Sequence, residues 1–402
     1  MIHNSAMENP FQFGRELGAN ELVDREQEIA EVIGTIRQAG KLFLIGPRRY
    51  GKTSVLKAAA DRLSSEGAVV LRYDAEAYPS LDLLIASVIS GAAKHLKGGV
   101  ERAGDAVRRY FGKLRPEVNF SITDREWNVS LRVADAAGGA RHIGLLVDML
   151  DGLEQLARAQ PEDRPVGLMI DEFQKVVDLG GTEAEAQIRA AIQRHKRTGY
   201  IFAGSKTRLL TAMTLDAARP FYRLGQLRFV GPVPRDDFGK FLRKGFNRSQ
   251  FIASAENAEE AVELILDLAD EVPYNVQLLA HACWEQLRAG KTSKERALTS
   301  AVVERSLDRV VRQYDPFYTQ LWNGVTAIQQ KTLLAVITEH GVNLQSTKVA
   351  QALGKGPSTI RRSLLSLTAR EILREEELEG KVRMRFEDPF FAQWIARFTA
   401  HP

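Results

Sequence analysis

Residues 41–54 read KLFLIGPRRYGKTS. The run Lys41–Ile45 is short and apolar, as a buried strand is, and the loop after it matches the pattern G-x-x-x-x-G-K-[ST]. Backbone N–H groups of such a loop wrap phosphate oxygens, while its lysine neutralises them and its hydroxyl binds Mg²⁺. Residues 53–64 continue at helical period, so a helix N-terminus adds its dipole to the anion site. The residues expected to contact phosphate are Gly46, Pro47, Arg48, Arg49, Tyr50, Gly51, Lys52, Thr53 and Ser54.

A second apolar run, Val166–Ile170, ends in a pair of carboxylates, Asp171 and Glu172. Phosphoryl transfer needs an anion that holds the metal and a group that orients the attacking water. We expect Asp171 to hold Mg²⁺ with Thr53, partly through water, and Glu172 to polarise the water. Lys52 is expected to act in catalysis as well as in binding.

Two further catalytic candidates rest on shorter patterns. The run Tyr200–Ala203 is followed by Gly204 and Ser205, so Ser205 is a candidate γ-phosphate sensor if its strand lies beside the strand of Asp171. The alternative is a simple turn former. Arg223 is the candidate for a transition-state charge, because arginine is always protonated and forked. Arg208 and Arg219 stand behind it, and the alternative for each arginine is an ordinary surface side chain.

Short apolar runs alternate with helical patterns through the first half of the chain. This order predicts an α/β fold, with a parallel P-loop sheet covered by helices on both faces. The expected strands are Lys41–Ile45, Ala68–Tyr73, Val166–Ile170, Tyr200–Ala203 and Leu227–Val230. An alternating segment at about 115–134 predicts an inserted β-hairpin, which either packs on the core as a flap or contacts a partner.

The second half of the chain is helical and then changes character. We expect an ATPase-type domain over 1–234, a helical lid over 235–320 and a winged-helix domain over 321–402. Ser346 can cap a helix that stops at Gly354, and a second helix can start at Ser358. Its predicted buried stripe is Ile360, Leu364, Leu365 and Leu367.

Positive charge gathers on this C-terminal module, at Lys348, Lys355, Arg361 and Arg362. Such a helix could enter the major groove of DNA while its cations bind phosphates. It could equally pack on protein, within the chain or on a partner. Both alternatives stay open.

Composition limits the classes that remain. The chain has 402 residues, of which 44% are hydrophobic and 26% charged, as in soluble globular proteins. Its net charge of +4 permits a nucleic-acid partner but does not require one. A single cysteine, Cys283, fits a reducing compartment, and the scattered histidines give no zinc pattern. With no long apolar stretch, we expect a cytoplasmic protein without membrane segments.

With these residues in hand, the chain resembles the archaeal-type P-loop ATPases, relatives of the AAA+ initiators and the STAND switch proteins. The matching pieces are Asn9–Phe11, Val23–Glu26, Gly46–Ser54, Ile170–Gln174, Gly204–Ser205, Val272–Tyr274 and Phe386–Trp394. The resemblance implies a sheet of the additional-strand class, a helical lid and a C-terminal winged helix. It also implies ATP and Mg²⁺ as ligands.

The same resemblance places the adenine between the lid and residues 23–26, with contacts from Val23, Arg25 and Pro273. The chain departs from the family at Glu271, where a glycine is usual, and in a shortened segment around Arg223. No Asn-Lys-x-Asp or Thr-Lys-x-Asp sequence of the GTPase type is present, so ATP is the expected nucleotide.

Two functions are consistent with these patterns. The first is an ATP-hydrolysing molecular switch in which the nucleotide state controls domain arrangement and contacts with a protein partner. The second is an ATP-regulated DNA-binding factor of a mobile-element, replication or defence system, in which nucleotide sets a homo-oligomer. A vestigial ATPase that serves as a scaffold fits less well, because Lys52, Thr53, Asp171 and Glu172 are all present.

Overall fold

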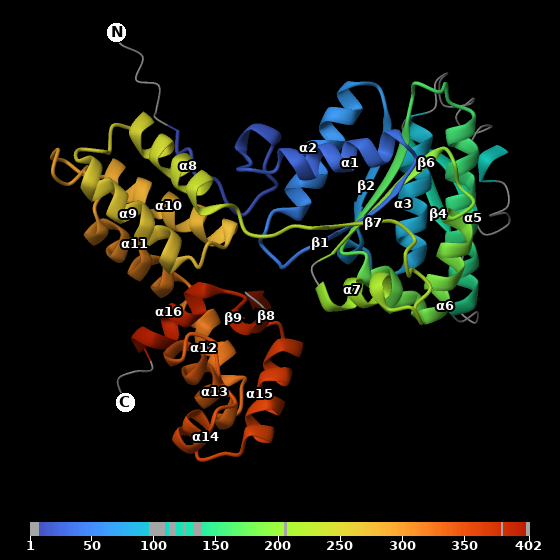
Figure 1. Ribbon diagram of the computed structural model, residues 1–402. Helices are drawn as coiled ribbons and strands as arrows, with labels where there is room; N and C mark the ends of the chain where they lie inside the picture. Colours follow the sequence, from blue (N-terminus) through green and yellow to red (C-terminus); the bar gives the residue numbers. More distant parts are fainter. Residues whose placement is uncertain are drawn as a thin grey trace, which may run out of the picture. The chain divides into compact units, whose positions relative to one another are not determined.

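The computed structural model describes residues 8–95, 109–111, 118–123, 126–131, 139–204, 207–378 and 381–398. The chain forms two compact units. One unit is Glu16–Gly231, and the other combines the described residues up to Arg15 with those from Pro232 onward (Figure 1). Within the described residues, no helix has the length and apolar character needed to cross a membrane.

The unit Glu16–Gly231 is built on one five-stranded sheet in the order β2-β5-β6-β1-β7. All four neighbouring pairs are parallel, which confirms the predicted parallel sheet. Strand β6 lies between the strand that precedes the phosphate loop and the strand that ends in Asp171. The strands are β1 (Lys41–Ile45), β2 (Val69–Asp74), β5 (Val166–Asp171), β6 (Thr198–Gly204) and β7 (Gln226–Phe229).

Helices cover both faces of this sheet, as expected. On one face, helix α1 lies directly on the strands because Gly167 and Gly199, which face each other in β5 and β6, lack side chains. A Cβ at Gly199 would come within 2.7 Å of the backbone of Ile36 in α1. The helices of this face are α1 (Glu26–Arg37) and α2 (Lys52–Ser65).

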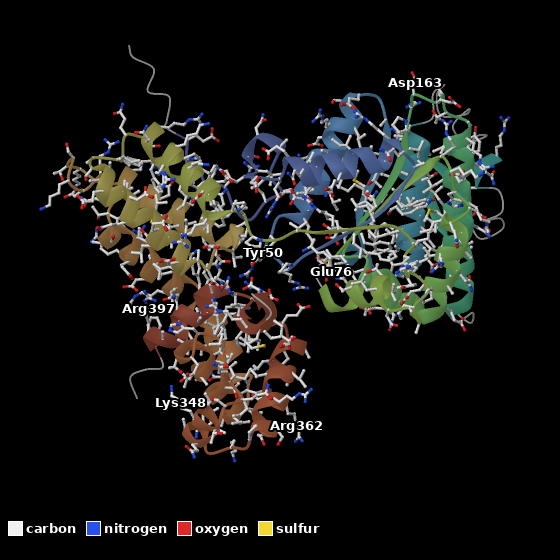
Figure 2. All side chains as sticks on the ribbon, viewed as in Figure 1. Tyr50, Glu76, Asp163, Lys348, Arg362 and Arg397 are labelled. Atoms are coloured by element: carbon white, nitrogen blue, oxygen red, sulfur yellow. The ribbon has the colours of Figure 1, made fainter. Side chains whose placement is uncertain are left out.

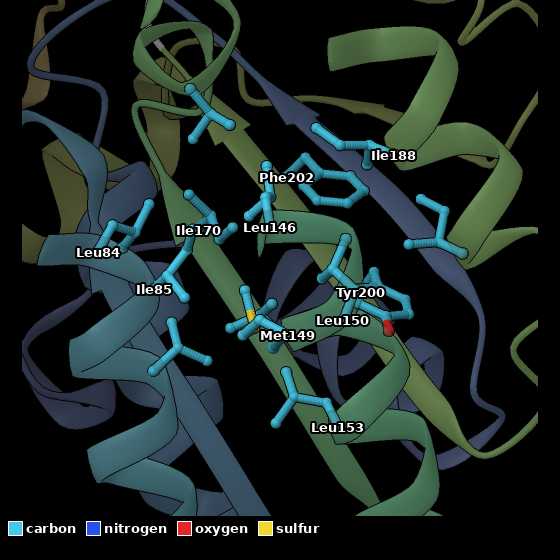
Figure 3. Packing of buried hydrophobic residues seen from close by; sticks show 14 of the residues in the cluster. Leu84, Ile85, Leu146, Met149, Leu150, Leu153, Ile170, Ile188, Tyr200 and Phe202 are labelled. Carbon is cyan, nitrogen blue, oxygen red and sulfur yellow. The ribbon is translucent and has the colours of Figure 1, made fainter. Parts of the chain in front are cut away.

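The opposite face carries the main hydrophobic core of the unit. Figure 3 shows Leu84 and Ile85 of α3 and Met149 of α5 packed over Ile170 and Phe202 of the sheet. All five side chains are buried. The elements on this side are α3 (Leu81–Lys94), α5 (Gly139–Arg158), α6 (Gln174–Ile192) and α7 (Thr207–Leu215), and short 3₁₀ turns η1 (Ala19–Glu21) and η2 (Ala75–Ala77) occur elsewhere in the unit.

The predicted hairpin is present as β3 (Val118–Thr123) paired antiparallel with β4 (Glu126–Leu131). Strand β4 lies against α3 of the same unit. Whether the hairpin also contacts a partner stays a prediction.

A polar cluster lies at the amino ends of the strands, and we call it the amino-edge network: the buried residues Glu154, His195, Thr198 and Tyr200, with partly exposed Asp151. The Nε2 of His195 donates to the Asp151 carboxylate at 2.9 Å, so its Nδ1 accepts from the Tyr200 hydroxyl at 2.7 Å. Burial lowers the pKa of His195, although Asp151 opposes the shift. Burial also raises the pKa of Tyr200.

Glu154 is the acceptor at the centre of this network. Its carboxylate accepts the backbone N–H groups of Lys196, Arg197 and Thr198, together with the Thr198 hydroxyl. Burial alone would raise the pKa of Glu154, but these hydrogen bonds outweigh it and hold the pKa below its ordinary value. The cluster therefore fixes the turn that leads into β6.

The second unit begins with a helical bundle that incorporates the start of the chain. Phe11 is buried against the rings of Phe241 and Phe246, and its carbonyl accepts from His281 Nδ1 at 2.7 Å. Asn9 donates to Glu285 at 3.2 Å. The bundle helices are α8 (Arg235–Arg248), α9 (Ala255–Leu268), α10 (Pro273–Arg288) and α11 (Ser300–Gln313).

The winged-helix module follows in the same unit. Its elements are α12 (Asp315–Asn323), α13 (Ala327–Thr338), α14 (Thr347–Leu353), α15 (Pro357–Ala369), β8 (Leu373–Leu378), β9 (Lys381–Phe386) and α16 (Pro389–Phe398). Strands β8 and β9 pair antiparallel as the wing. Ser346 caps α14 and Gly354 ends it with φ 61°, both as predicted.

The start and one buried position of α15 differ from the prediction. Gly356 is the N-cap and Pro357 is the first helical residue, a place that proline favours, so the helix begins before Ser358. Leu365, expected in the buried stripe, is 46% exposed. Helical spacing explains the error, because Ser363, three residues after Ile360, is buried instead and donates to Thr332 at 2.9 Å.

Candidate active site

The phosphate loop runs from the end of β1 into α2, and two glycines make its path possible. A Cβ at Gly46 would lie 2.6 Å from the carbonyl oxygen of Val230, which follows the neighbouring strand β7. Gly51, the N-cap of α2, has φ 89°, a region that favours glycine. Arg49 also has a positive φ, of 68°. The loop is therefore tightly curved where its N–H groups open toward the helix N-terminus.

Lys52 lies inside this loop. Its buried ammonium donates to the carbonyl oxygens of Gly46 at 2.9 Å and Pro47 at 2.8 Å. A buried cation needs such acceptors, and the loop backbone supplies them. The arrangement holds a positive charge among the N–H groups of the loop, as a site for an anionic ligand requires.

Thr53 and Asp171 meet across the end of β6. The Thr53 hydroxyl donates to Asp171 Oδ2 at 2.6 Å, and the backbone N–H of Glu172 donates to Oδ1 at 3.0 Å. Asp171 is only 2% exposed. Burial raises its pKa, and the hydrogen bond from Thr53 works against that shift. A hydroxyl and a carboxylate are oxygen ligands of the kind Mg²⁺ takes, so the donor set fits that ion.

Glu172 follows Asp171 at the carboxyl edge of the sheet in a left-handed conformation, with φ 48°. The next residue is fixed by a hydrogen bond from Phe173 N–H to the carbonyl of Ala203, at 2.8 Å. The carboxylate of Glu172 accepts a hydrogen bond from Gln174 Nε2. Strained backbone of this kind is frequent at functional sites.

Two other predicted contact residues, Arg25 and Ser54, connect the phosphate loop to residues beside the two points where the chain passes from one unit to the other. Arg25 is buried, and its guanidinium donates to the carbonyls of Gly231 at 2.7 Å and Tyr50 at 3.5 Å. Burial lowers the pKa of Arg25. The Ser54 hydroxyl accepts from the backbone N–H of Leu17 at 3.0 Å. Both crossing points therefore begin beside the phosphate loop.

The remaining loop positions are more exposed. Arg48 forms an ion pair with Glu76 at 3.5 Å, and both side chains are about half exposed. Tyr50, by contrast, is buried; Figure 2 labels Tyr50 and Glu76 within this unit. Val23 is half-buried in the segment that leads into Arg25.

The structure does not bring Arg223, the first arginine candidate, to the phosphate loop of its own chain. Arg223 has φ 53°, stacks over Tyr222 with 5.1 Å to the ring centroid, and lines a cavity of about 550 Å³ with Lys41 and Gly225. These residues lie where β1 and β7 begin, whereas the phosphate loop follows the end of β1. Arg219 pairs with buried Glu185.

The structure does not test the remaining site predictions. Ser205 and the side chain of Arg208 lie outside the described residues, although β6 does pair with β5 as the sensor prediction required. Pro273 belongs to the second unit, where it opens α10. Glu271 has φ 55°, and Arg235 donates to its carboxylate at 2.7 Å.

The basic residues of the winged helix form an exposed group. Lys348 is 78% exposed and pairs with Glu339 at 3.0 Å. Lys355, Arg361 and Arg362 are exposed at the start of α15 and just before it. Figure 2 shows Lys348 and Arg362 at the α14–α15 end of the module.

Gln174 belongs to the matching segment Ile170–Gln174, but the sequence alone assigns it no role. Its signal was the spacing of two residues from Glu172, which puts it at the first turn of the helix after β5. The amino-edge network was also missed, because its carboxylates precede its other members by more than forty residues.

Comparisons with known proteins support the fold. No protein-family model matches the chain, and no curated protein matches it. Among solved structures, a Walker-type ATPase of Pyrococcus abyssi matches with a TM-score of 0.62 at 18% identity, over 96% of this chain and 99% of that one. The ORC2 protein of Aeropyrum pernix, solved as ADPNP–ADP complexes, matches with a TM-score of 0.53 at 14% identity, over 97% and 96%. The chain thus has the fold of the Walker-type and AAA+ ATPases over nearly its full length, as the resemblance in sequence implied.

Proposed function

We propose that the chain binds ATP with Mg²⁺ and hydrolyses it, and that it acts as a nucleotide-controlled molecular switch of the AAA+ or STAND type. The observation that carries this proposal is the hydrogen bond of 2.6 Å between Thr53 and Asp171. It joins the end of the phosphate loop to the end of β5, two places 118 residues apart in sequence. A hydroxyl and a buried carboxylate that converge beside a buried lysine suit a metal–phosphate site.

Each residue of the site has a distinct task. Lys52 binds the β and γ oxygens of ATP in exchange for the carbonyls of Gly46 and Pro47. Thr53 and Asp171 would hold Mg²⁺, Asp171 partly through water. Mg²⁺, when bound, neutralises developing charge on the phosphate oxygens. Glu172 accepts a proton from the attacking water.

The nucleotide is proposed from the fold and from the sequence together. The ORC2 protein of similar fold was solved with ADPNP and ADP. The adenine contacts of Val23, Arg25 and Pro273, and the sensor role of Ser205, are proposed on the family resemblance alone. Arg25 and Ser54 link the loop to Gly231 and Leu17, so a nucleotide that moves the loop acts directly on both crossings of the chain.

ATP binding by Lys52→Ala tests the site. We expect affinity to fall at least about 100-fold, because a buried charge contact with the phosphates is lost. Lys57→Ala is the matched control, since Lys57 lies on the same helix and pairs with Asp61 on the surface. Unchanged affinity in Lys52→Ala would place the nucleotide elsewhere.

ATP turnover by Glu172→Gln tests the chemistry. This variant should keep ATP affinity and lose roughly 10²- to 10⁴-fold in turnover, as expected when a general base is removed. Glu183→Gln, at an exposed position of α6, is the control. If Glu172→Gln hydrolyses ATP at the wild-type rate, the base is another group.

DNA binding through the winged helix is the second candidate function. It is favoured by the exposed cations Lys355, Arg361 and Arg362 beside the exposed Leu365. Duplex affinity should fall steeply with salt and weaken in the variant Arg361→Ala/Arg362→Ala. The pair Arg248→Ala/Arg305→Ala removes the same charge from exposed positions of α8 and α11. Equal affinity in both double variants would exclude α15, and a protein partner would become the favoured occupant.

A nucleotide-dependent homo-oligomer is part of the proposal. Arg223 precedes β7 at the edge opposite the phosphate loop, and the strands between these edges are about 15 Å long. Arg223 can therefore act on a phosphate only if a second copy of the chain brings one to it.

A further inference from the structure

Gln174 is the first residue of α6 and lies behind the proposed base. Its side chain is only 2% exposed, and its Nε2 donates to Oε2 of Glu172. Its Oε1 makes no hydrogen bond to any residue that the structure describes. That oxygen lies against Gly204 at the end of β6, where an added Cβ would collide with it. Nε2 of the amide therefore has a partner in Glu172, whereas Oε1 is buried without a hydrogen bond to any described residue.

A structural role does not explain this amide. A buried amide oxygen without a hydrogen bond lowers stability, whereas an apolar side chain of similar size would fill the same space without that cost. The hydrogen bond to Glu172 does not require burial of the second amide atom. The hydrogen bond that Nε2 donates to Glu172 is therefore the interaction that explains why an amide is present.

A polar cavity lies beside Gln174. Gln174 lines a cavity of about 310 Å³ with Glu76, Lys175 and Asp178. All four lining side chains are polar, and the volume holds several water molecules. Glu76 also pairs with Arg48 of the phosphate loop, so the cavity adjoins the edge of the sheet where hydrolysis is proposed.

We infer that Gln174 is a positioning residue for ATP hydrolysis, which orients the carboxylate of Glu172 through its Nε2. This inference rests on the proposed role of Glu172. Gln174 neither gains nor loses a proton in this role. Its hydrogen bond keeps the carboxylate of Glu172 in one orientation, so that the base does not have to find that orientation in each cycle.

The variant Gln174→Met tests the inference. Methionine fills nearly the same volume but cannot donate the hydrogen bond to Glu172. We expect kcat to fall about 10- to 100-fold and KM for ATP to stay within about twofold. The thermal midpoint should be at least that of the wild type, because the open amide oxygen is gone. Gln193→Met, at the exposed end of the same helix, is the matched control. Gln174→Asn keeps the amide but shortens its reach, and it should lose kcat in the same way.

Combination with Glu172→Gln separates this inference from the proposed function. If Gln174 acts through Glu172, Gln174→Met adds no further loss of kcat in the Glu172→Gln background. An additive loss, a lowered thermal midpoint with weaker ATP binding, or a wild-type kcat in Gln174→Met would each overturn the inference and leave the proposed base in place. Full activity of Glu172→Gln alone would instead remove the proposed base, and the inference with it.

Discussion

Two buried polar clusters lie at opposite edges of the same parallel sheet, and their atoms are satisfied in different ways. In the amino-edge network, both ring nitrogens of His195 are bonded and Glu154 accepts four hydrogen bonds from residues 196–198. At the carboxyl edge, the ammonium of Lys52 donates to carbonyls of its own loop, and Oε1 of Gln174 is buried without a hydrogen bond to any described residue. Glu172 and Arg49 add left-handed backbone there.

This difference in hydrogen bonding distinguishes a cluster that serves stability from one that serves function more clearly than burial or charge does. A network whose members satisfy one another rigidifies the fold and has little left to offer a ligand. A network with strained backbone and exchangeable acceptors loses stability in the free protein and can regain it on binding. Substitutions at the two edges should therefore change activity and stability in opposite patterns.

Asp171→Asn should give the largest effect on activity. We expect ATP turnover to fall by roughly 100-fold, because the proposed Mg²⁺ site loses its anionic residue. Burial raises the pKa of Asp171, so the unfolded chain ionises first as pH rises and stability falls through the folded pKa. The uncharged asparagine avoids that loss, and its free energy of unfolding in urea at pH 7 should equal or exceed the wild-type value. Asp61→Asn, an exposed position, is the control. A free energy of unfolding below the wild-type value in Asp171→Asn would contradict the proposed difference between the two edges.

Glu154→Gln should give the largest effect on stability. An amide cannot accept all the N–H groups that the carboxylate accepts, so the free energy of unfolding should fall by about 2–4 kcal/mol. Turnover per folded molecule should stay at the wild-type level. Urea denaturation and ATPase assays measure the two quantities, with Glu162→Gln as an exposed control. A selective loss of turnover would connect the two edges functionally.

The titration of His195 should produce a smaller, pH-dependent change. The groups that face it are Asp151, Tyr200, Arg194, Lys41 and Glu154. Because burial lowers its pKa, the unfolded chain binds the proton first as pH falls below about 6.5. Stability should then decrease with falling pH, by at most about 1.4 kcal/mol per pH unit, until the folded pKa is passed.

Unfolding free energies at pH 7, 6 and 5 measure this slope for the wild type and for His195→Gln. The variant should show a flatter dependence over that range. Equal slopes would mean that another group carries the pH dependence of the amino edge.

Arg223→Ala should have the smallest effect in dilute solution. Arg223 is exposed, so we expect stability to change by less than about 0.5 kcal/mol and turnover to be unchanged at low protein concentration. If copies of the chain assemble on nucleotide, wild-type turnover per molecule rises with protein concentration and that of the variant does not. A concentration-independent wild type would remove the oligomer from the proposal.

The sheet could be read from the sequence because its determinants are local. Strand β1 was predicted to the residue, and the phosphate loop and Asp171–Glu172 mark the ends of their strands by composition alone. Helix α15 was found, but Leu365 was misplaced, since one apolar residue outside a stripe still fits a loosely read period. The packing of Phe11 on α8 has no local signal.

The site could be predicted only in part, for a related reason. A motif identifies Lys52 and Thr53, because glycines and a lysine at fixed spacing have one well-known use. The distance between Thr53 and Asp171 depends on which strand lies between them, and composition does not give strand order. The unpaired oxygen of Gln174 is even harder to predict from the sequence, since its position depends on the space left by Gly204.

The packing of the N-terminal segment imposes an order on assembly during synthesis. Asn9 donates to the carbonyl of His281, which the ribosome adds 272 residues later, and Phe11 needs α8 before its ring is covered. The unit Glu16–Gly231 contains all of its own strands and can fold as it emerges. The nascent chain therefore carries Phe11 uncovered until that unit is complete, and a chaperone that binds exposed aromatic segments has its longest opportunity there.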